Sequence, residues 1–224
     1  NAVLDQLKND TATGAIHLNE NTRTLSFLYY NQNRLNSYFL DGQFTKGLTY
    51  IPELLEALEK FEKRIDDHHI MVFYYKIACM YFGAGDNLSC ITYLDKIISN
   101  KDLKMREDLL CFSRVLNLVA HYEAGIDFNI DKLIVSTYKF LLKMNDLQQV
   151  QLKFIAFLKE LGQMYPHDLR KGFIKLHEDL KQFENHPKEK RAFLYLDILS
   201  WLESKIHNTS VEQVIQEKSK KLIK

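Results

Sequence analysis

Residues 70–98 read IMVFYYKIACMYFGAGDNLSCITYLDKII, two apolar stretches separated by the four residues Gly83-Ala84-Gly85-Asp86. In each stretch the hydrophobic side chains recur at three- and four-residue steps, which is the pattern of a helix with one buried face. A connection of four residues can join two such helices only if they run antiparallel. The segment therefore predicts a helical hairpin, with helices over about Ile70–Phe82 and Leu88–Ile98.

The hairpin pattern recurs on both sides of this segment. Tyr38, Tyr81 and Tyr122 each precede a turn that contains glycine, and they are 43 and 41 residues apart. A repeating unit of this length indicates stacked helical hairpins, because one hairpin cannot bury its apolar face alone. The expected organisation is an irregular arm over residues 1–21, three hairpins over residues 22–145, and C-terminal helices over residues 146–224 that continue the stack.

Composition favours helices over strands. The chain of 224 residues contains only eight glycines and three prolines, less than half of average usage and too few turn-formers for a many-stranded barrel or sandwich. Hydrophobic residues make up 46% and charged residues 26%, a balance that allows a sizeable core. The predicted fold class is all-α, a right-handed α-α superhelix of hairpins with an irregular helical C-terminal part.

Charge, cysteine usage and hydropathy indicate which ligands and which cellular compartment to expect. The formal net charge of +1 argues against a dedicated polyanion binder, because such binding depends on neutralised phosphates. The three cysteines lie in apolar helical patterns without C-x-x-C spacing, which favours a reducing compartment. No apolar stretch reaches the roughly 18 residues of a membrane span. We therefore expect a soluble, cytoplasmic protein.

Patterns that would indicate catalysis are weak. The eight histidines include no pair at three- or four-residue spacing and no H-E-x-x-H, so no zinc site is expected. Asp66-Asp67-His68-His69 is interpreted as a helix start, and Gly83-Ala84-Gly85-Asp86 as a turn, because a phosphate cradle would follow a strand. We predict a protein without catalytic residues, cofactor or metal, and an enzyme remains the weakest alternative.

The middle hairpin resembles the tetratricopeptide repeat, and partial matches in the flanking hairpins extend the resemblance over about residues 22–145. The spacing of about 42 residues is longer than the usual unit of about 34, so HEAT-like repeats of about 40–47 residues are the alternative. The resemblance rests on eight residues of the middle hairpin, Tyr74, Ile77, Ala78, Tyr81, Gly85, Cys90, Leu94 and Ile97. In this order they correspond to the aromatic, leucine, small, tyrosine, turn-glycine, small, aromatic and small positions of the family.

This resemblance implies partner binding in a concave groove lined by the first helix of each hairpin. Members that clamp a C-terminal carboxylate use a set of lysine, asparagine and basic residues of which only Asn36 has a counterpart here, so that ligand is not implied. The function expected is a non-catalytic scaffold for a peptide or partner protein. The groove residues implied are Gln32, Asn36, Tyr75, Lys76 and Asn117, with Cys79, Leu116 and Ala120 beside them.

Two other functions fit the sequence. Residues 170–191 and 205–224 each carry an excess of three positive charges, so a nucleic-acid-associated module that uses these basic C-terminal faces is one alternative. A stacking surface would need exposed aromatic residues between the charges, however, and Phe173 and Phe183 fall on the apolar side of their helix. The other alternative is a peptide-sensing regulator built on the same array, whose oligomeric state would change with a peptide.

Overall fold

The computed structural model describes residues 6, 19–61, 64–100, 107–126, 130–144, 148–161, 163–187, 189, 193 and 197–222. Within these ranges the chain forms helices and no strand, which confirms the all-α class. Most of the arm expected over residues 1–21 lies outside the described residues, and the first long helix already begins at Glu20.

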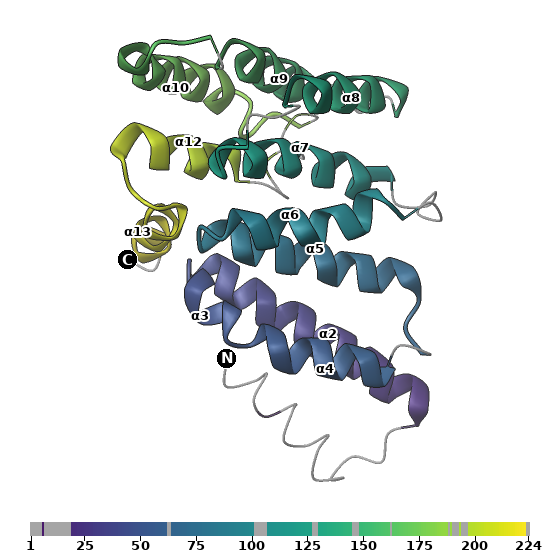
Figure 1. The fold of residues 1–224 in the computed structure, drawn as a ribbon. Helices are drawn as coiled ribbons and strands as arrows, with labels where there is room; N and C mark the ends of the chain where they lie inside the picture. Colours follow the sequence, from purple (N-terminus) through teal and green to yellow (C-terminus); the bar gives the residue numbers. More distant parts are fainter. Residues whose placement is uncertain are drawn as a thin grey trace.

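The helices are stacked in layers, with α2 and α4 at one end, α5 and α6 above them, then α7, and α8 to α10 at the other end (Figure 1). None of the described helices has the length and hydropathy of a transmembrane segment. The helices are α2 (Glu20–Leu40), α3 (Phe44–Leu48), α4 (Ile51–Phe61), α5 (Asp67–Gly83), α6 (Asn87–Ile98), α7 (Glu107–Glu123), α8 (Ile130–Lys143), α9 (Gln149–Leu161), α10 (Pro166–Lys181), α12 (Ile198–His207) and α13 (Val211–Leu222).

Four helices start with the same side-chain cap, in which an Asn or Asp accepts a hydrogen bond from the backbone N–H three residues later. The caps are Asn19, Asp66, Asp86 and Asp197. Such a cap satisfies one of the free N–H groups of the first turn and is worth about 1 kcal/mol. The helix start expected at Asp66–His69 is thereby confirmed, with Asp66 Oδ1 3.0 Å from the His69 nitrogen.

The first helices of the first two hairpins end in the same way. Gly42 and Gly85 have φ angles of +60° and +86°, the left-handed conformation that glycine adopts without steric cost. The N–H that follows each glycine donates to the carbonyl of Tyr38 or Tyr81, at 2.8 and 2.9 Å. The two tyrosines are therefore structurally equivalent, as their spacing predicts.

The third hairpin departs from this pattern by one residue. Gly125 is also left-handed, with φ of +65°, but the N–H after it donates to His121, so His121 and not Tyr122 stands at the repeat position. The ring of Tyr122 meets the Trp201 ring of α12 edge-on at 6.3 Å, whereas the Tyr81 ring stacks on Tyr93 within its own hairpin at 5.7 Å. The third unit is thus coupled to the C-terminal helices.

Helix α5 is buried on opposite sides and joins the two parts of the core. Phe73 and Ile77 are fully buried against the α2–α4 end, and Ala78 and Phe82 belong to the larger cluster that extends to α12. A helix that is apolar around most of its circumference is expected at the centre of a protein. The arrangement explains why residues 70–82 are the most hydrophobic helical stretch of the repeat region.

The C-terminal helices do not extend the stack beyond α10. Helix α12 turns back beside α7, where the Trp201 indole donates to Glu123 at 2.7 Å and its ring meets Phe154 and Phe173 edge-on at 5.8 Å. Helix α13 returns as far as α3 (Figure 1). Of the C-terminal helices predicted to continue the stack over residues 146–224, α9 and α10 lie on top of it, whereas α12 and α13 fold back. A repeat period does not show where helices that do not match the repeat will pack.

Two further boundaries differ from the expected ones. The return helix of the first hairpin is divided into α3 and α4, with Pro52 as the second residue of α4, where proline's missing N–H costs little. The apolar spacing also predicts a helix over Lys188–Ile206, but α12 begins at Ile198, and most of residues 188–196 lies outside the described part. The helices predicted over Ile70–Phe82 and Leu88–Ile98 match α5 and α6 within three residues.

Replacing Gly83 by alanine should destabilise the protein, although alanine normally favours a helix. An added Cβ would lie 2.4 Å from the Phe44 ring, and overpacking of this kind costs about 1–3 kcal/mol. Gly172→Ala in α10 is the control, because its nearest neighbour is the flexible Met164 side chain at 3.0 Å. Urea unfolding should show the larger loss for Gly83→Ala, and equal losses would contradict the tight α3–α5 contact.

Candidate interaction surface

One exposed side of α2 carries a row of residues at helical spacing. Leu25, Tyr29, Gln32 and Asn36 follow one another at steps of four, three and four residues, which places them on one face of the helix. Leu25 and Tyr29 are 50% and 62% exposed, and Gln32 and Asn36 are half-buried. We call these four residues the α2 stripe. Large apolar side chains exposed in a row are typical of interaction sites.

Lys76 of α5 joins the end of the α2 stripe. Its ammonium donates to Asn36 Oδ1 at 2.5 Å, and the Phe39 ring centroid lies 6.0 Å away. Burial lowers the pKa of Lys76, and no carboxylate among the described residues offsets this effect. A half-buried cation with only a neutral amide as partner is under-compensated, because buried charges are usually paired.

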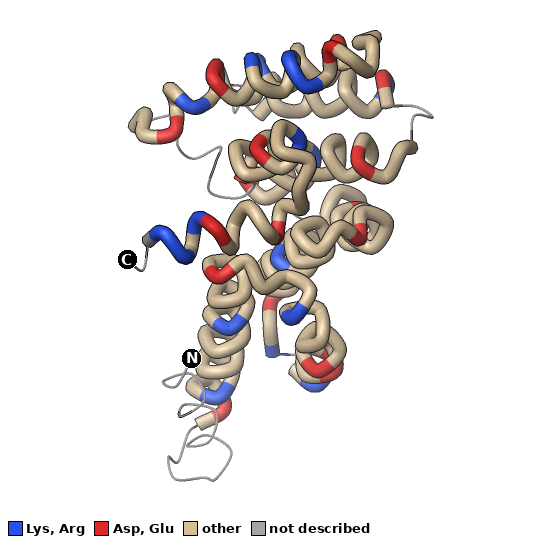
Figure 2. The backbone as a smooth tube through the Cα atoms, turned by 90° about the vertical axis from the view of Figure 1, so that its left-hand side faces the viewer, with Lys and Arg blue, Asp and Glu red and all other residues tan. Residues whose placement is uncertain are grey.

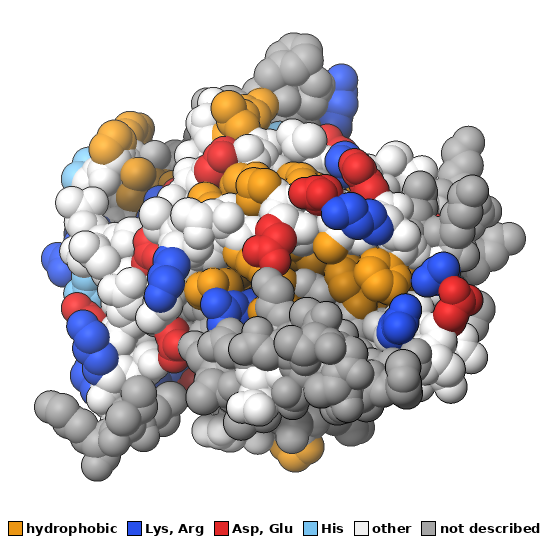
Figure 3. All heavy atoms as spheres, turned by 90° about the horizontal axis from the view of Figure 1, so that it is seen from below, with side chains coloured by type: hydrophobic (Ala, Val, Ile, Leu, Met, Phe, Trp, Pro, Cys, Tyr) orange, Lys and Arg blue, Asp and Glu red, His pale blue; other side chains and the backbone are white. Residues whose placement is uncertain are grey.

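Hydrophobic and charged side chains alternate on the face seen from below the stack, on the side of α2 and α4 (Figure 3). Apolar patches are bordered there by acidic and basic side chains. Exposed apolar side chains and charges of both signs therefore lie close together at the α2 end of the stack.

The structure brings together three of the predicted groove residues, Gln32, Asn36 and Lys76, but not Tyr75 and Asn117. Tyr75 is 5% exposed, in the larger core cluster, and Asn117 is 3% exposed, with its amide bonded to Asp95 of α6. Successive helical positions point about 100° apart, and here Tyr75 points into the core while Lys76 reaches Asn36. The prediction that Tyr75 and Asn117 line a groove is therefore wrong, because both side chains lie in the interior.

Helix α7, the first helix of the third hairpin, has no exposed side chain at the predicted groove positions. Leu116 and Ala120 are completely buried, and so are most residues between Cys111 and Ala120. Helices α6 and α8 pack on α7, and α12 contacts its C-terminal end at Glu123. The predicted groove positions on α7 are therefore enclosed, whereas Gln32, Asn36 and Lys76 on α2 and α5 are not fully buried.

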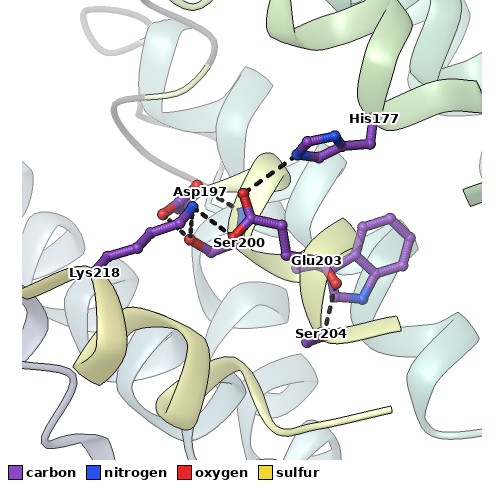
Figure 4. Close-up of polar contacts among 7 residues, drawn as sticks. His177, Asp197, Ser200, Glu203, Ser204 and Lys218 are labelled. Carbon is purple, nitrogen blue, oxygen red and sulfur yellow. Dashed lines mark hydrogen bonds and ion pairs between the residues drawn. The ribbon is translucent and has the colours of Figure 1, made fainter. Parts of the chain in front are cut away.

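A polar network that the sequence does not reveal connects α10, α12 and α13 (Figure 4). Glu203 lies 3.2 Å from His177 and 3.0 Å from Lys218, and Lys218 also donates to Ser200 Oγ at 2.8 Å. Ser200 is fully buried and donates its hydroxyl hydrogen to Asp197. The Ser200 hydroxyl is enclosed between Asp197 and Lys218 and thereby links α12 to α13.

The basic C-terminal faces offer little support for a nucleic-acid surface. Lys171 lies 3.6 Å from Asp168, Lys218 lies 3.0 Å from Glu203 and Lys205 lies 2.5 Å from Glu123, and Phe173 is buried. Lys and Arg are interspersed with Asp and Glu along the described helices, apart from the basic end of α13 (Figure 2). Phe183 is half-buried, so neither phenylalanine of this segment offers the open ring on which single-strand binders stack bases.

Comparison of the chain with protein-family models, curated proteins and solved structures finds no match. The resemblance to tetratricopeptide repeats therefore stays a prediction carried by the residues quoted above. Within the described ranges, no group of three His, Cys, Asp or Glu side chains is placed to hold a metal ion. Of the features described, the α2 stripe with Lys76 offers most to a ligand.

Replacing Lys76 by methionine should stabilise the fold at neutral pH, on the order of 1 kcal/mol, because an under-compensated cation is removed. The pKa of Lys76 is lowered in the folded protein, so the unfolded chain binds this proton more tightly. The charged Lys76 therefore lowers the unfolding free energy of the wild type. This destabilisation is complete below the lowered pKa and disappears as the pH rises towards the ordinary pKa of 10.5.

Urea unfolding of the wild type and Lys76→Met, measured at pH values from 7 to 10.5, tests this expectation. The difference in unfolding free energy should shrink as the pH rises. Lys132→Met, at an exposed position of α8, controls for the general effect of removing a lysine. If the difference in unfolding free energy between wild type and Lys76→Met stays constant with pH, the Lys76 charge does not destabilise the folded protein.

Proposed function

We propose that this chain is a non-catalytic protein-interaction module that binds a peptide or partner helix along the α2 stripe and Lys76. The observation that carries the proposal is the half-buried Lys76 ammonium, whose partners among the described residues are the neutral Asn36 amide and the Phe39 ring. A carboxylate from a partner would supply the missing charge, and charge-assisted hydrogen bonds are about twice as strong as neutral ones.

The apolar part of the same surface supplies the second contribution. Leu25 and Tyr29 are largely exposed, and covering them removes apolar area from water at about 25 cal/mol per Å². Both lie on a 21-residue helix that is packed on its opposite side, so little conformational freedom is lost on binding. A partner with an apolar side chain and a nearby carboxylate could reach micromolar affinity, about 8 kcal/mol.

A random peptide library displayed on phage tests the proposal directly. Peptides selected on the immobilised protein should be enriched in acidic and large apolar residues. For a selected peptide, calorimetry should show about tenfold weaker binding to Lys76→Ala and to Leu25→Ala, the loss expected for one charge-assisted or one buried apolar contact. Lys132→Ala on α8, at the other end of the stack, should bind with wild-type affinity.

The same variants identify the outcome that would overturn the proposal. Peptides whose affinity is unchanged by Lys76→Ala, Leu25→Ala and Tyr29→Ala would bind elsewhere on the molecule. Binding of single-stranded oligonucleotides with a steep dependence on salt would instead favour the nucleic-acid alternative.

A further inference from the structure

Helix α13 contacts a part of the chain that is 167 to 174 residues away in sequence. Glu212 accepts hydrogen bonds from the backbone nitrogen and the hydroxyl of Thr45, at 3.0 and 2.6 Å. Gln216 donates to the carbonyl of Gly42 at 2.9 Å. The Glu212 carboxylate thus caps the first turn of α3, where free N–H groups favour a negative charge.

The opposite contact of α13 is also polar. Lys218 donates to Ser200 Oγ at 2.8 Å and lies 3.0 Å from Glu203, both on α12 (Figure 4). Helix α13 therefore bridges the first hairpin and the C-terminal helices. Its two anchor points are hydrogen bonds and an ion pair, which water can replace when the contact opens.

Apolar support for α13 comes from three side chains. Val214 is buried, and Val211 and Ile215 are half-buried against the two core clusters, whereas the shorter α12 fully buries six residues. A helix of 12 residues is marginally stable in water on its own. Once released, α13 would therefore unfold, and its backbone hydrogens would exchange with solvent.

We propose that α13 is a reversible closing helix, which docks on the turn at Gly42–Thr45 and detaches as a unit while α5 to α12 stay folded. Segments with few apolar contacts are the ones that open below the global unfolding free energy. The docked state fixes the C-terminal end of α2, where Asn36 and Phe39 contact Lys76. That link to the binding surface rests on the proposed function, but the opening itself does not.

Two glycines provide a matched test of the opening. An alanine Cβ at position 42 would lie 2.7 Å from the backbone nitrogen of Gln216, whereas at position 125 it would meet nothing within 4 Å. Both residues are left-handed, with φ of +60° and +65°, so Gly42→Ala and Gly125→Ala introduce similar strain into their turns. Only Gly42→Ala presses against α13.

Hydrogen exchange followed by mass spectrometry on the full chain measures the outcome. We expect exchange of residues 211–222 to rise about tenfold or more in Gly42→Ala and to remain within about twofold of wild type in Gly125→Ala, with α5 and α7 equally protected in both. Equal exchange of α13 in the two variants would overturn the proposal. So would exchange of α13 that rises only together with that of α5 and α7.

A second pair of variants tests the same contact without a turn residue. Glu212→Ala removes both hydrogen bonds to Thr45, while Glu217→Ala alters an exposed residue of the same helix. Exchange of α13 should rise about tenfold in Glu212→Ala and stay unchanged in Glu217→Ala. No rise in Glu212→Ala would show that the polar contacts do not hold α13. Failure of peptide binding in the earlier experiment would leave these exchange results unaffected.

Discussion

The central constraint of this fold is the burial of α5 on opposite sides. Phe73 and Ile77 face the α2–α4 end, and Ala78 and Phe82 face the cluster that reaches α12. Because interiors pack at crystal-like density, α3 can approach α5 only where a side chain is missing, as at Gly83 against Phe44. The positions of α2, and hence of Asn36 beside Lys76, follow from this packing.

Much of the fold follows from local patterns in the sequence. Apolar spacing, Asn or Asp caps and left-handed glycines are all decided within a few residues, so the helices and the turns at Gly42 and Gly85 could be predicted. The path of the C-terminal helices could not, because it depends on Trp201 meeting Glu123 and Tyr122 of α7. Contacts between residues some 80 positions apart leave no periodic signal.

The proposed binding surface was only partly predictable for a related reason. A family resemblance places residues by sequence position, but exposure depends on what else packs nearby. Asn117 occupies a predicted groove position and is nevertheless enclosed, because α6 and α8 pack on α7 and α12 meets its end. Asn36 keeps its predicted place beside Lys76 because α2 lies at one end of the stack, next to α5.

The contrast between α12 and α13 shows how the same chain can combine permanent and reversible contacts. Trp201 anchors α12 through three aromatic neighbours and a hydrogen bond, and removing so large a buried ring typically costs about 3–5 kcal/mol. The anchors of α13 are mostly polar, and water competes for each of them. The last helix is therefore the part of the described C-terminal region that can respond to a partner at small free-energy cost. Its partner on the protein, the Gly42 turn, is also the end of the helix that carries the α2 stripe.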